Sequence, residues 1–281
     1  MKLTTLPVCL LAGATLMAPA FLRAGAVNVI VVVDESGSMA GEHAWLPGMI
    51  SSMDTQLTGM GHTASFGLYG FGGGGGGNLG RELLDNGSAT DFATAAAGLT
   101  IGGGFEDGYS GLDFAFNNFS FTPGAAVNYI LVTDEDRDNG NATLSVSGIQ
   151  TMLAGQNALL NAVVDNAFSC DAGGALGLAP GSTGYVADGA GGFSTCGNGA
   201  AGSGFGTTEA DYVSLALASG GAGWDLNQLR AGGATATSFT AAFVDLKVQE
   251  ISRQIDAPEP GAFLLMAIGL LAIGFRRRMT A

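Results

Sequence analysis

The sequence predicts an α/β fold in which a doubly wound, mostly parallel sheet is flanked by helices. Near-continuous apolar runs at 27–33 and at the start of 126–136 are typical of strands that are buried on both faces of a parallel sheet. Segments with apolar residues at helical spacing lie between and after these runs. Buried strands that alternate with helices are typical of parallel strands joined by helical crossovers.

The other elements continue this alternation along the chain. Leu46, Ile50, Met53 and Leu57 recur at helical spacing and predict a helix over 43–58. We further expect strands at 63–72 and near 158–165. We expect helices at 90–99, near 144–153 and at 238–255, and one more in the second part of 102–119, after a loop.

Residues 1–26 are predicted to be a secretory signal peptide. Lys2 supplies the positive start, an apolar stretch follows, and both 18–20 and 24–26 are cleavage candidates of small residues. We favour Ala26, because the first predicted strand begins directly after it. An N-terminal core helix is the alternative, but Pro7 and Pro19 interrupt the segment and it has no polar face. We therefore expect the protein to be exported.

The C-terminal residues predict a transmembrane helix. The apolar stretch 261–275 is somewhat shorter than the roughly 20 residues of an ordinary spanning helix. Arg276, Arg277 and Arg278 follow it directly. Positive residues favour the cytoplasmic side, so we expect the bulk of the protein to lie outside.

The predicted domain between these ends, 27–256, is strongly acidic. It holds 23 acidic and five basic residues, which leaves about 18 net negative charges. Such a field disfavours nucleic acid and anionic membrane surfaces as partners and favours divalent cations.

Cys170 and Cys196 are the two cysteines of the predicted domain. Exported proteins meet oxidising conditions, so we expect a disulfide between them. It would close a glycine-rich insertion at 169–207 and contribute about 3 kcal/mol through loop-closure entropy. A metal site made by these two cysteines is disfavoured, because no histidine or third cysteine lies nearby.

Acids and hydroxyls follow the two buried strands. Asp34, Ser36 and Ser38 come after the first strand, and Asp134 comes after the later one. If the strands are neighbours, these groups converge at the carboxyl edge of the sheet, where ligands bind in open α/β sheets. A divalent cation such as Mg²⁺ or Mn²⁺ would remove the repulsion between the acids. In an alternative reading Asp34 caps a helix, which leaves the second acidic strand end unexplained.

Four short stretches carry a resemblance to a known family. The stretch VVVDESGSM resembles the metal-ion-dependent adhesion site of von Willebrand factor A domains, and ILVTDED resembles that family's later strand with its terminal aspartate. GGGFEDGY resembles the middle loop, and LASGGAGWDL resembles the late strand and turn. The resemblance covers about 27–256 apart from the glycine-rich insertion and implies a Rossmann-like fold of this family.

The resemblance also implies a set of metal ligands. Asp34, Ser36 and Ser38 match the first loop, and Asp134 matches the third. The middle loop departs from the pattern, because many members place a metal-binding threonine where Phe105 stands here. Of the residues that follow, Glu106 or Asp107 could substitute for that threonine, directly or through water. The expected cofactor is Mg²⁺, with Mn²⁺ or Ca²⁺ as alternatives.

The segment 257–281 resembles a second known element, the PEP-CTERM sorting signal. Pro258, Glu259 and Pro260 precede the apolar stretch and the arginine cluster, which is the order found in that signal. The resemblance implies a Gram-negative bacterium, processing by an exosortase after an inner-membrane intermediate, and delivery to the cell surface or extracellular matrix. An ordinary membrane anchor is the alternative, but it does not account for the Pro-Glu-Pro motif.

Together these resemblances imply an exported adhesion or interaction protein rather than an enzyme. Its partner would be an acidic protein or an exopolysaccharide-matrix ligand that binds through the metal. A structural matrix component, with a metal that only stabilises the fold, is the first alternative, and a metal-assisted hydrolase is the second. The glycines at 72–77 are not followed by a phosphate-loop lysine, so we expect a flexible loop there. His43 and His62 are isolated, so we expect structural or surface roles for them, with a supporting role beside the metal loop as an alternative for His43.

Overall fold

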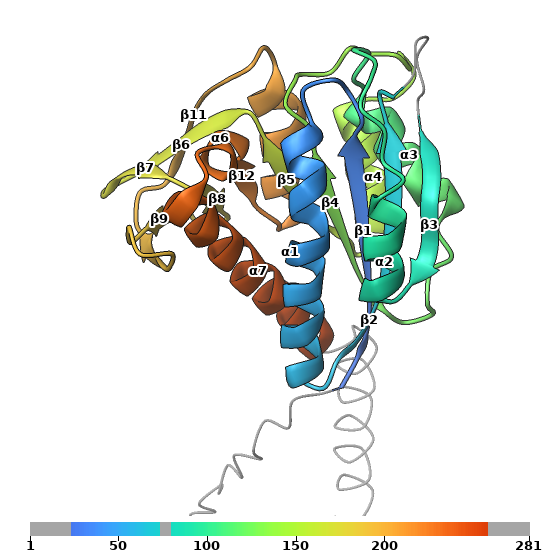
Figure 1. Ribbon diagram of the computed structural model, residues 1–281, viewed down its shortest axis with the longest axis horizontal. Coiled ribbons are helices and arrows are strands. Elements are labelled where there is room, and N and C mark those ends of the chain that lie inside the picture. The colour runs from blue at the N-terminus through green and yellow to red at the C-terminus, as the bar shows by residue number, and fades with distance from the viewer. Residues whose placement is uncertain (1–23, 74–79, 258–281) are drawn as a thin grey trace, which may run out of the picture.

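The central feature of the computed structural model, which describes residues 24–73 and 80–257, is a nine-stranded sheet (Figure 1). Its strands are β1 (Ala26–Asp34), β2 (Thr63–Phe71), β3 (Arg81–Gly87), β4 (Ala126–Val132), β5 (Leu159–Val164), β8 (Gly177–Ala179), β9 (Thr183–Ala187), β10 (Phe193–Cys196) and β12 (Gly223–Asp225). Their order across the sheet is β10-β9-β8-β12-β5-β4-β1-β2-β3.

The five strands in the middle of this sheet, from β12 to β2, run parallel to one another. The strands at both flanks pair antiparallel, so the whole sheet is mixed. The β-branched run in β1 forms a fully buried strand, since such side chains pack well on both faces of a covered sheet. The prediction of an α/β fold is therefore confirmed, with a parallel centre and antiparallel margins.

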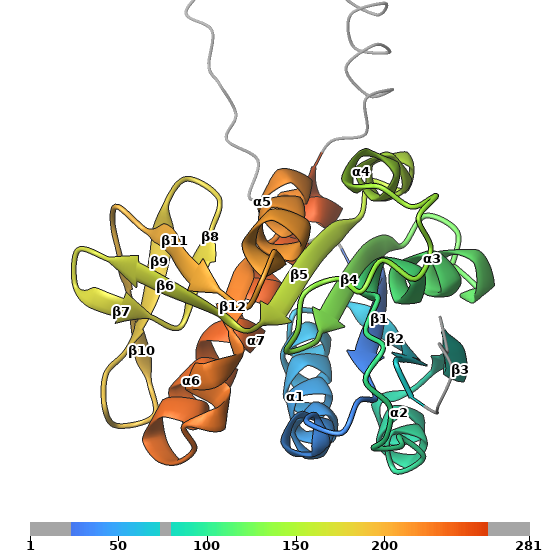
Figure 2. The ribbon, with the colours of Figure 1, turned by 90° about the horizontal axis from the view of Figure 1, so that it is seen from above.

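Helices cover both faces of the sheet, as Figure 2 shows. The α-helices are α1 (Ala40–Gly59), α2 (Ala89–Ala96), α3 (Gly108–Asn118), α4 (Val146–Gly155), α5 (Ser214–Ser219), α6 (Leu226–Arg230) and α7 (Gly233–Asp256), and a short π-helix η1 (Glu209–Val213) precedes α5. Alternate residues of β1 point to the two faces. Val31 belongs to the core that includes Ile50 of α1 and Phe243 of α7, whereas Val32 belongs to the core that includes Leu112 of α3.

The glycine-rich segment 169–207 is made of strands rather than of an open loop. Three of its strands, β8, β9 and β10, extend the main sheet, while β6 (Asn166–Cys170), β7 (Gly173–Ala175) and β11 (Ala200–Gly204) form a second sheet. Its glycines allow close packing: a Cβ on Gly177 would lie 2.5 Å from the Trp224 ring, and one on Gly184 would lie 2.7 Å from Cys196 Sγ.

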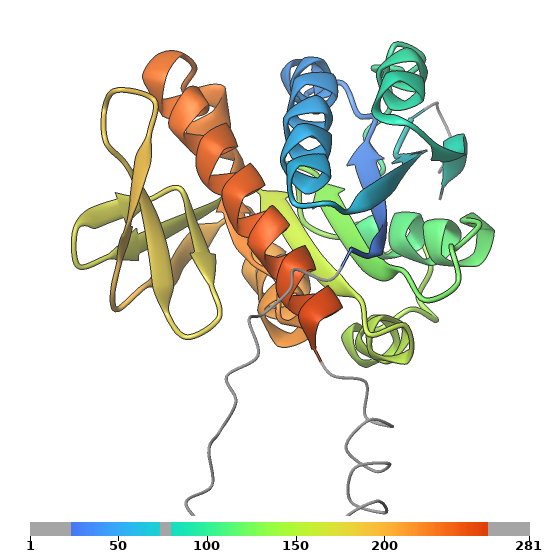
Figure 3. The ribbon, with the colours of Figure 1, turned by 90° about the horizontal axis from the view of Figure 1, so that it is seen from below.

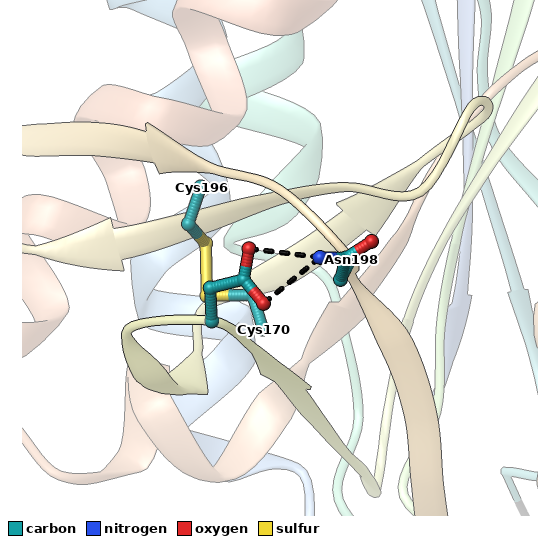
Figure 4. The surroundings of a disulfide bond; sticks show 4 residues. Cys170, Cys196 and Asn198 are labelled. Carbon is teal, nitrogen blue, oxygen red and sulfur yellow. Dashed lines mark hydrogen bonds between the residues drawn. A yellow bond between two sulfur atoms is a disulfide. The ribbon is translucent and has the colours of Figure 1, made fainter.

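The predicted disulfide is present and joins the two sheets. Cys170 lies in β6 and Cys196 in β10, with their Cα atoms 6.0 Å apart (Figure 4). Beside the bridge, Asn198 Nδ2 donates to both carboxylate oxygens of Asp171 at 3.0 Å. The disulfide thus ties the smaller sheet to the margin of the larger one.

The two ends of the described chain lie together at one end of the domain. A Cβ on Gly25, just before β1, would lie 2.8 Å from Ile255 Cγ2 in the last turn of α7. In Figure 3, α7 runs beside α1 and finishes where β1 begins. The amino-terminal edge of the parallel strands is therefore also where the described C-terminal residues lie.

Some predicted features lie outside the described residues. They are the body of the signal peptide before residue 24, most of the glycine loop 72–77, the helix 261–275 and the sorting motif with its arginines. Among residues 24–73 and 80–257, no helix is both long and apolar enough to cross a membrane.

Candidate metal centre

The acid-bearing ends of two adjacent strands meet at the carboxyl edge of the sheet. Strand β1 pairs in parallel with β4 and places Val33 opposite Val132. Asp34 ends β1, and Asp134 follows β4 after one intervening residue, Thr133. In Figure 1 this is the upper edge, where β1 leads into the loop before α1.

Three carboxyl groups form a cluster at this edge. One carboxylate oxygen from each of Asp34, Glu106 and Asp134 lies within 4.8 Å of the other two. All three residues are buried, with exposed fractions of 0%, 3% and 8%. The prediction that acids from separate strand ends converge is confirmed, and Glu106 is the third member of the cluster.

Hydroxyl groups and a backbone N–H orient these carboxylates. The backbone N–H of Ser36 donates to Asp34 Oδ1 at 2.7 Å, and Ser38 Oγ donates to Asp134 Oδ1 at 3.0 Å. The two serine hydroxyls lie 3.0 Å apart and hydrogen-bond to each other. Thr133 Oγ1 donates to Asp34 Oδ2 at 3.0 Å. The D-x-S-x-S loop and the acid of the later strand therefore share one hydrogen-bonded network.

Gly72 allows the chain to pass close over the first acidic residue. Its φ is +77°, a left-handed conformation that side chains other than glycine rarely adopt. A Cβ here would lie 2.9 Å from Asp34 Oδ1 and 3.3 Å from the carbonyl oxygen of Phe105. A side chain at this position would fill the space beside the carboxylates, so glycine keeps that space open.

Burial and the closeness of the carboxyl groups disfavour the ionised forms of Asp34 and Glu106. Burial raises the pKa of Asp34, even though hydrogen bonds at its oxygens act in the opposite direction. Burial, together with the adjacent Asp34 carboxyl, raises the pKa of Glu106 to about 9. Among the described residues, buried Glu106 Oε2 has no hydrogen-bond partner. A small divalent cation fits this donor set, because hard oxygen ligands suit it and its charge offsets their repulsion.

Asp107, the other middle-loop candidate, lies apart from the cluster. Its carboxylate accepts hydrogen bonds from Arg137 Nε at 2.7 Å, Ser110 Oγ at 2.8 Å and the Asn141 backbone N–H at 3.0 Å. Burial acts against ionisation, but these partners hold the pKa of Asp107 below its ordinary value. Since its oxygens are already bonded and turned to Arg137, we leave Asp107 out of the proposed ligand set.

Glu106 is held in place through its backbone. Its N–H donates to Asp138 Oδ2 at 2.7 Å, and its carbonyl oxygen accepts from the Asp138 N–H at 2.9 Å. This pair of bonds ties the middle loop to the loop after β4. Sequence reasoning did not identify Asp138, although it lies only a few residues after the acidic strand end.

An arginine borders the cluster and was also not anticipated. Arg230, at the end of α6, donates from Nη2 to Asp134 Oδ2 at 2.8 Å and from Nε to Glu42 Oε1 at 2.6 Å. These bonds contribute to raising its pKa, despite the opposing effect of burial. The sequence offers one indication of this role: Arg230 is one of only five basic residues in 27–256, where few positive side chains can pair with the acids.

The neighbouring acid and histidine have structural roles. Glu35 is buried but points away from the cluster, where it pairs with Arg81 and accepts from the Thr100 N–H at 2.7 Å. His43 Nε2 lies 2.7 Å from the carbonyl oxygen of Asp34 and supports the loop backbone. The structural role expected for His43 agrees with this contact.

Comparison with protein families and solved structures adds two findings. Residues 256–278 match the model of the PEP-CTERM protein-sorting motif. A comparison with curated proteins finds none that matches the chain. Among solved structures, a conserved hypothetical protein BatB from Bacteroides thetaiotaomicron is 15% identical with a TM-score of 0.48, covering 82% of this chain and 100% of that one.

Two further solved structures are similar to the chain. One is an aerotolerance-related membrane protein from Bacteroides fragilis NCTC 9343, at 14% identity and a TM-score of 0.46, covering 80% of this chain and 99% of that one. The other is the vWF domain of the type V pili tip protein Mfa5 from Porphyromonas gingivalis, at 18% identity and 0.34, covering 41% and 40%. The chain thus carries a PEP-CTERM protein-sorting motif at residues 256–278 and includes an α/β domain.

Proposed function

We propose that the protein is an exported surface or matrix protein that holds a divalent cation and uses it in adhesion or protein interaction. The observation that carries this proposal is the buried cluster of Asp34, Glu106 and Asp134 at the carboxyl edge of the sheet. The proposed ligand set adds the hydroxyls of Ser36 and Ser38, which hydrogen-bond within the cluster. The bound cation would supply a positive charge to which an acidic group of a partner can bind.

The residues around the cluster prepare it for this role. Thr133 and the Ser36 backbone hold both oxygens of Asp34, so the carboxylate is oriented before a cation arrives. Gly72 leaves the space beside it free of a side chain. The acidic surroundings attract cations and repel anions, so a carboxylate partner would approach mainly where the cation offsets the negative field.

The sorting motif supports a proposal for the route to the surface. We propose that the signal peptide directs export, that the C-terminal helix holds an inner-membrane intermediate, and that an exosortase acts near Pro258, Glu259 and Pro260. The match at 256–278 supports this route. Replacing Glu259 with Gln, followed by cell fractionation, tests it: the variant should remain in the membrane fraction while the wild-type protein reaches the surface. Equal surface delivery of both would overturn the proposed route.

Calorimetric titration of the purified protein with Mg²⁺, Mn²⁺ and Ca²⁺ tests the cation site. We expect one site per chain, with heat that disappears in Asp34→Ala and persists in Asp256→Asn, a control at an exposed residue. Equal titration curves for the two variants would contradict the assignment of the ligands. Binding of the protein to cell-surface and matrix material, with and without EDTA, then tests adhesion.

A structural matrix component is the second candidate function, and one observation favours it. The oxygens of the cluster are buried, so a cation would relieve an electrostatic cost within the fold even without a partner. In that case EDTA would lower the melting temperature and leave binding to matrix material unchanged. Metal-dependent turnover of an ester or glycan would instead favour a hydrolase.

A further inference from the structure

A second buried polar site lies between α7 and the sheet, away from the acidic cluster. Lys247 of α7 is fully buried, with an exposed fraction of 0%. It lies beside Glu250, one helical turn further on, and near Asn161 of β5, which are 5% and 0% exposed. A lysine is almost never fully buried unless it is paired, so the chemistry of its surroundings bears on what it does.

One oxygen of Glu250 connects the amine and the amide. Glu250 Oε2 accepts from Lys247 Nζ at 3.2 Å and from Asn161 Nδ2 at 2.8 Å. On the other side of the amide, Trp224 Nε1 donates to Asn161 Oδ1 at 3.0 Å. The site therefore brings together an amine and a carboxamide. A carboxyl group contacts the nitrogens of both, and an N–H group donates to the carboxamide oxygen.

The surroundings favour the neutral form of the amine. Trp224, Phe239 and Phe243 are fully buried, and their rings pack together with centroid distances of 5.3 Å to 6.3 Å. Burial lowers the pKa of Lys247, although the nearby Glu250 acts against this shift. Glu250 Oε1 is buried and has no hydrogen-bond partner among the described residues. A neutral amine is a nucleophile, whereas an ammonium group is not.

We propose that Lys247 and Asn161 join through an intramolecular amide bond, with Glu250 as the catalytic acid and base. The lone pair of Lys247 Nζ attacks Cγ of Asn161, and a new C–N bond forms. The Cγ–Nδ2 bond then breaks. Glu250 takes a proton from Nζ and delivers one to Nδ2, which leaves as ammonia. The negative charge that develops on Oδ1 is stabilised by the Trp224 N–H.

The step balances without an added reactant. One amine and one primary amide give one secondary amide and one ammonia molecule, and no oxidant or reductant takes part. Nζ and Asn161 Nδ2 contact the same oxygen of Glu250, at 3.2 Å and 2.8 Å, and Nζ stands at the end of a flexible four-carbon stem. Rotation of that stem would bring Nζ toward Cγ. The product would tie α7 covalently to β5 in the parallel part of the sheet.

Trypsin digestion with mass spectrometry of the purified, reduced full-length protein tests the proposal. In an unlinked chain trypsin cleaves after Arg137, Arg230, Lys247 and Arg253. A lysine in an amide bond is not cleaved, so we expect 231–253 to remain whole and to be joined to 138–230. The joined product should be lighter than the two peptides together by one ammonia molecule.

Three variants sharpen this experiment. Lys247→Met removes the nucleophile with a side chain of similar length, and Glu250→Gln removes the acid and base with a nearly identical shape; both should lack the joined product. Gln249→Glu changes an exposed neighbour on the same helix and should retain it. The wild-type digest is decisive even if a variant fails to fold: recovery of free 231–247 and 248–253 in full yield would overturn the proposal.

Discussion

The acidic cluster and the Lys247 site solve the same physical problem in different ways. Each contains a buried carboxyl group with one oxygen that lacks a hydrogen-bond partner within the described residues, Glu106 Oε2 in one and Glu250 Oε1 in the other. At the Lys247 site the chain itself supplies hydrogen-bond partners for the acid, because Lys247 Nζ and Asn161 Nδ2 both donate to Glu250 Oε2. At the cluster three acids face one another, and the chain provides only an arginine at the border. The comparison teaches that a bound cation would do for the cluster what neighbouring side chains do for Glu250, as the proposed function requires.

The largest expected effect comes from removing the acid of the internally compensated site. Glu250→Ala removes the acid that the proposed amide bond needs, so Lys247 stays a free amine, buried without its acceptor. This should lower the free energy of unfolding by about 3–5 kcal/mol. Urea unfolding measures this change. Glu209→Ala, at an exposed glutamate, is the control and should stay within about 0.5 kcal/mol of the wild type. Equal stability of the two variants would mean that the buried pair is not compensating.

The next effect comes from the external cation. Mg²⁺ at about 100 times its dissociation constant should raise the free energy of unfolding by about 2.7 kcal/mol, because it binds the folded cluster and not the unfolded chain. EDTA should reverse the gain, and Asp34→Ala should abolish it. Thermal melts with and without Mg²⁺ measure the change. The same gain in Asp34→Ala would place the stabilising cation elsewhere.

Two adjacent acids sharpen the comparison within one loop. Asp107→Asn weakens a buried ion pair with Arg137 and should cost about 1–3 kcal/mol of folding stability, with cation affinity nearly unchanged. Glu106→Gln should weaken cation binding by more than about tenfold, as loss of even a supporting group does. It should leave the cation-free fold at least as stable, because a neutral amide replaces an uncompensated acid. Calorimetric titration and urea unfolding of both variants separate the two roles.

Arg230→Gln gives the smallest expected effect. It removes a positive charge 2.8 Å from Asp134, a proposed ligand, and should tighten cation binding by up to about tenfold, since like charges repel across a partly exposed site. Arg253→Gln, at an exposed residue of α7, is the control. Weaker cation binding in Arg230→Gln would mean that the arginine mainly positions Asp134.

The parallel centre of the sheet and its acidic edge were predictable from local patterns. The run in β1 and the run in β4 are both apolar and end in acids, and parallel strands bring such ends to one edge. Asp34 and Asp134 could therefore be paired from the sequence alone. Helix α1 was predictable because its buried residues recur at helical spacing.

The antiparallel margins were not predictable in the same way. The strands between 166 and 204 are rich in glycine and alanine, which have low strand propensity, so their pairing depends on the disulfide and on packing against Trp224. Strand β3 was missed because it is a half-buried edge strand with polar residues and an irregular register. Its sequence lacks a clear alternation of apolar and polar residues.

The middle loop shows where sequence reasoning stops. Glu106 and Asp107 are adjacent acids, and only the backbone direction before α3 decides which one faces the cluster. Arg137 holds Asp107 from a loop 30 residues away, and Arg230 approaches Asp134 from 96 residues away. Such partners are brought together by the complete fold and have no local pattern.

The meeting of the two chain ends has a consequence for orientation. Asn128, which lies opposite Val29 near the start of β1, donates from Nδ2 to Gln254 Oε1 near the end of α7 at 2.9 Å, while Asp34 lies at the opposite end of β1. A nine-residue strand spans about 30 Å. An attachment made beyond Ala257 would therefore lie at one end of the domain, and the acidic cluster would lie at the other end, facing away from the attachment point.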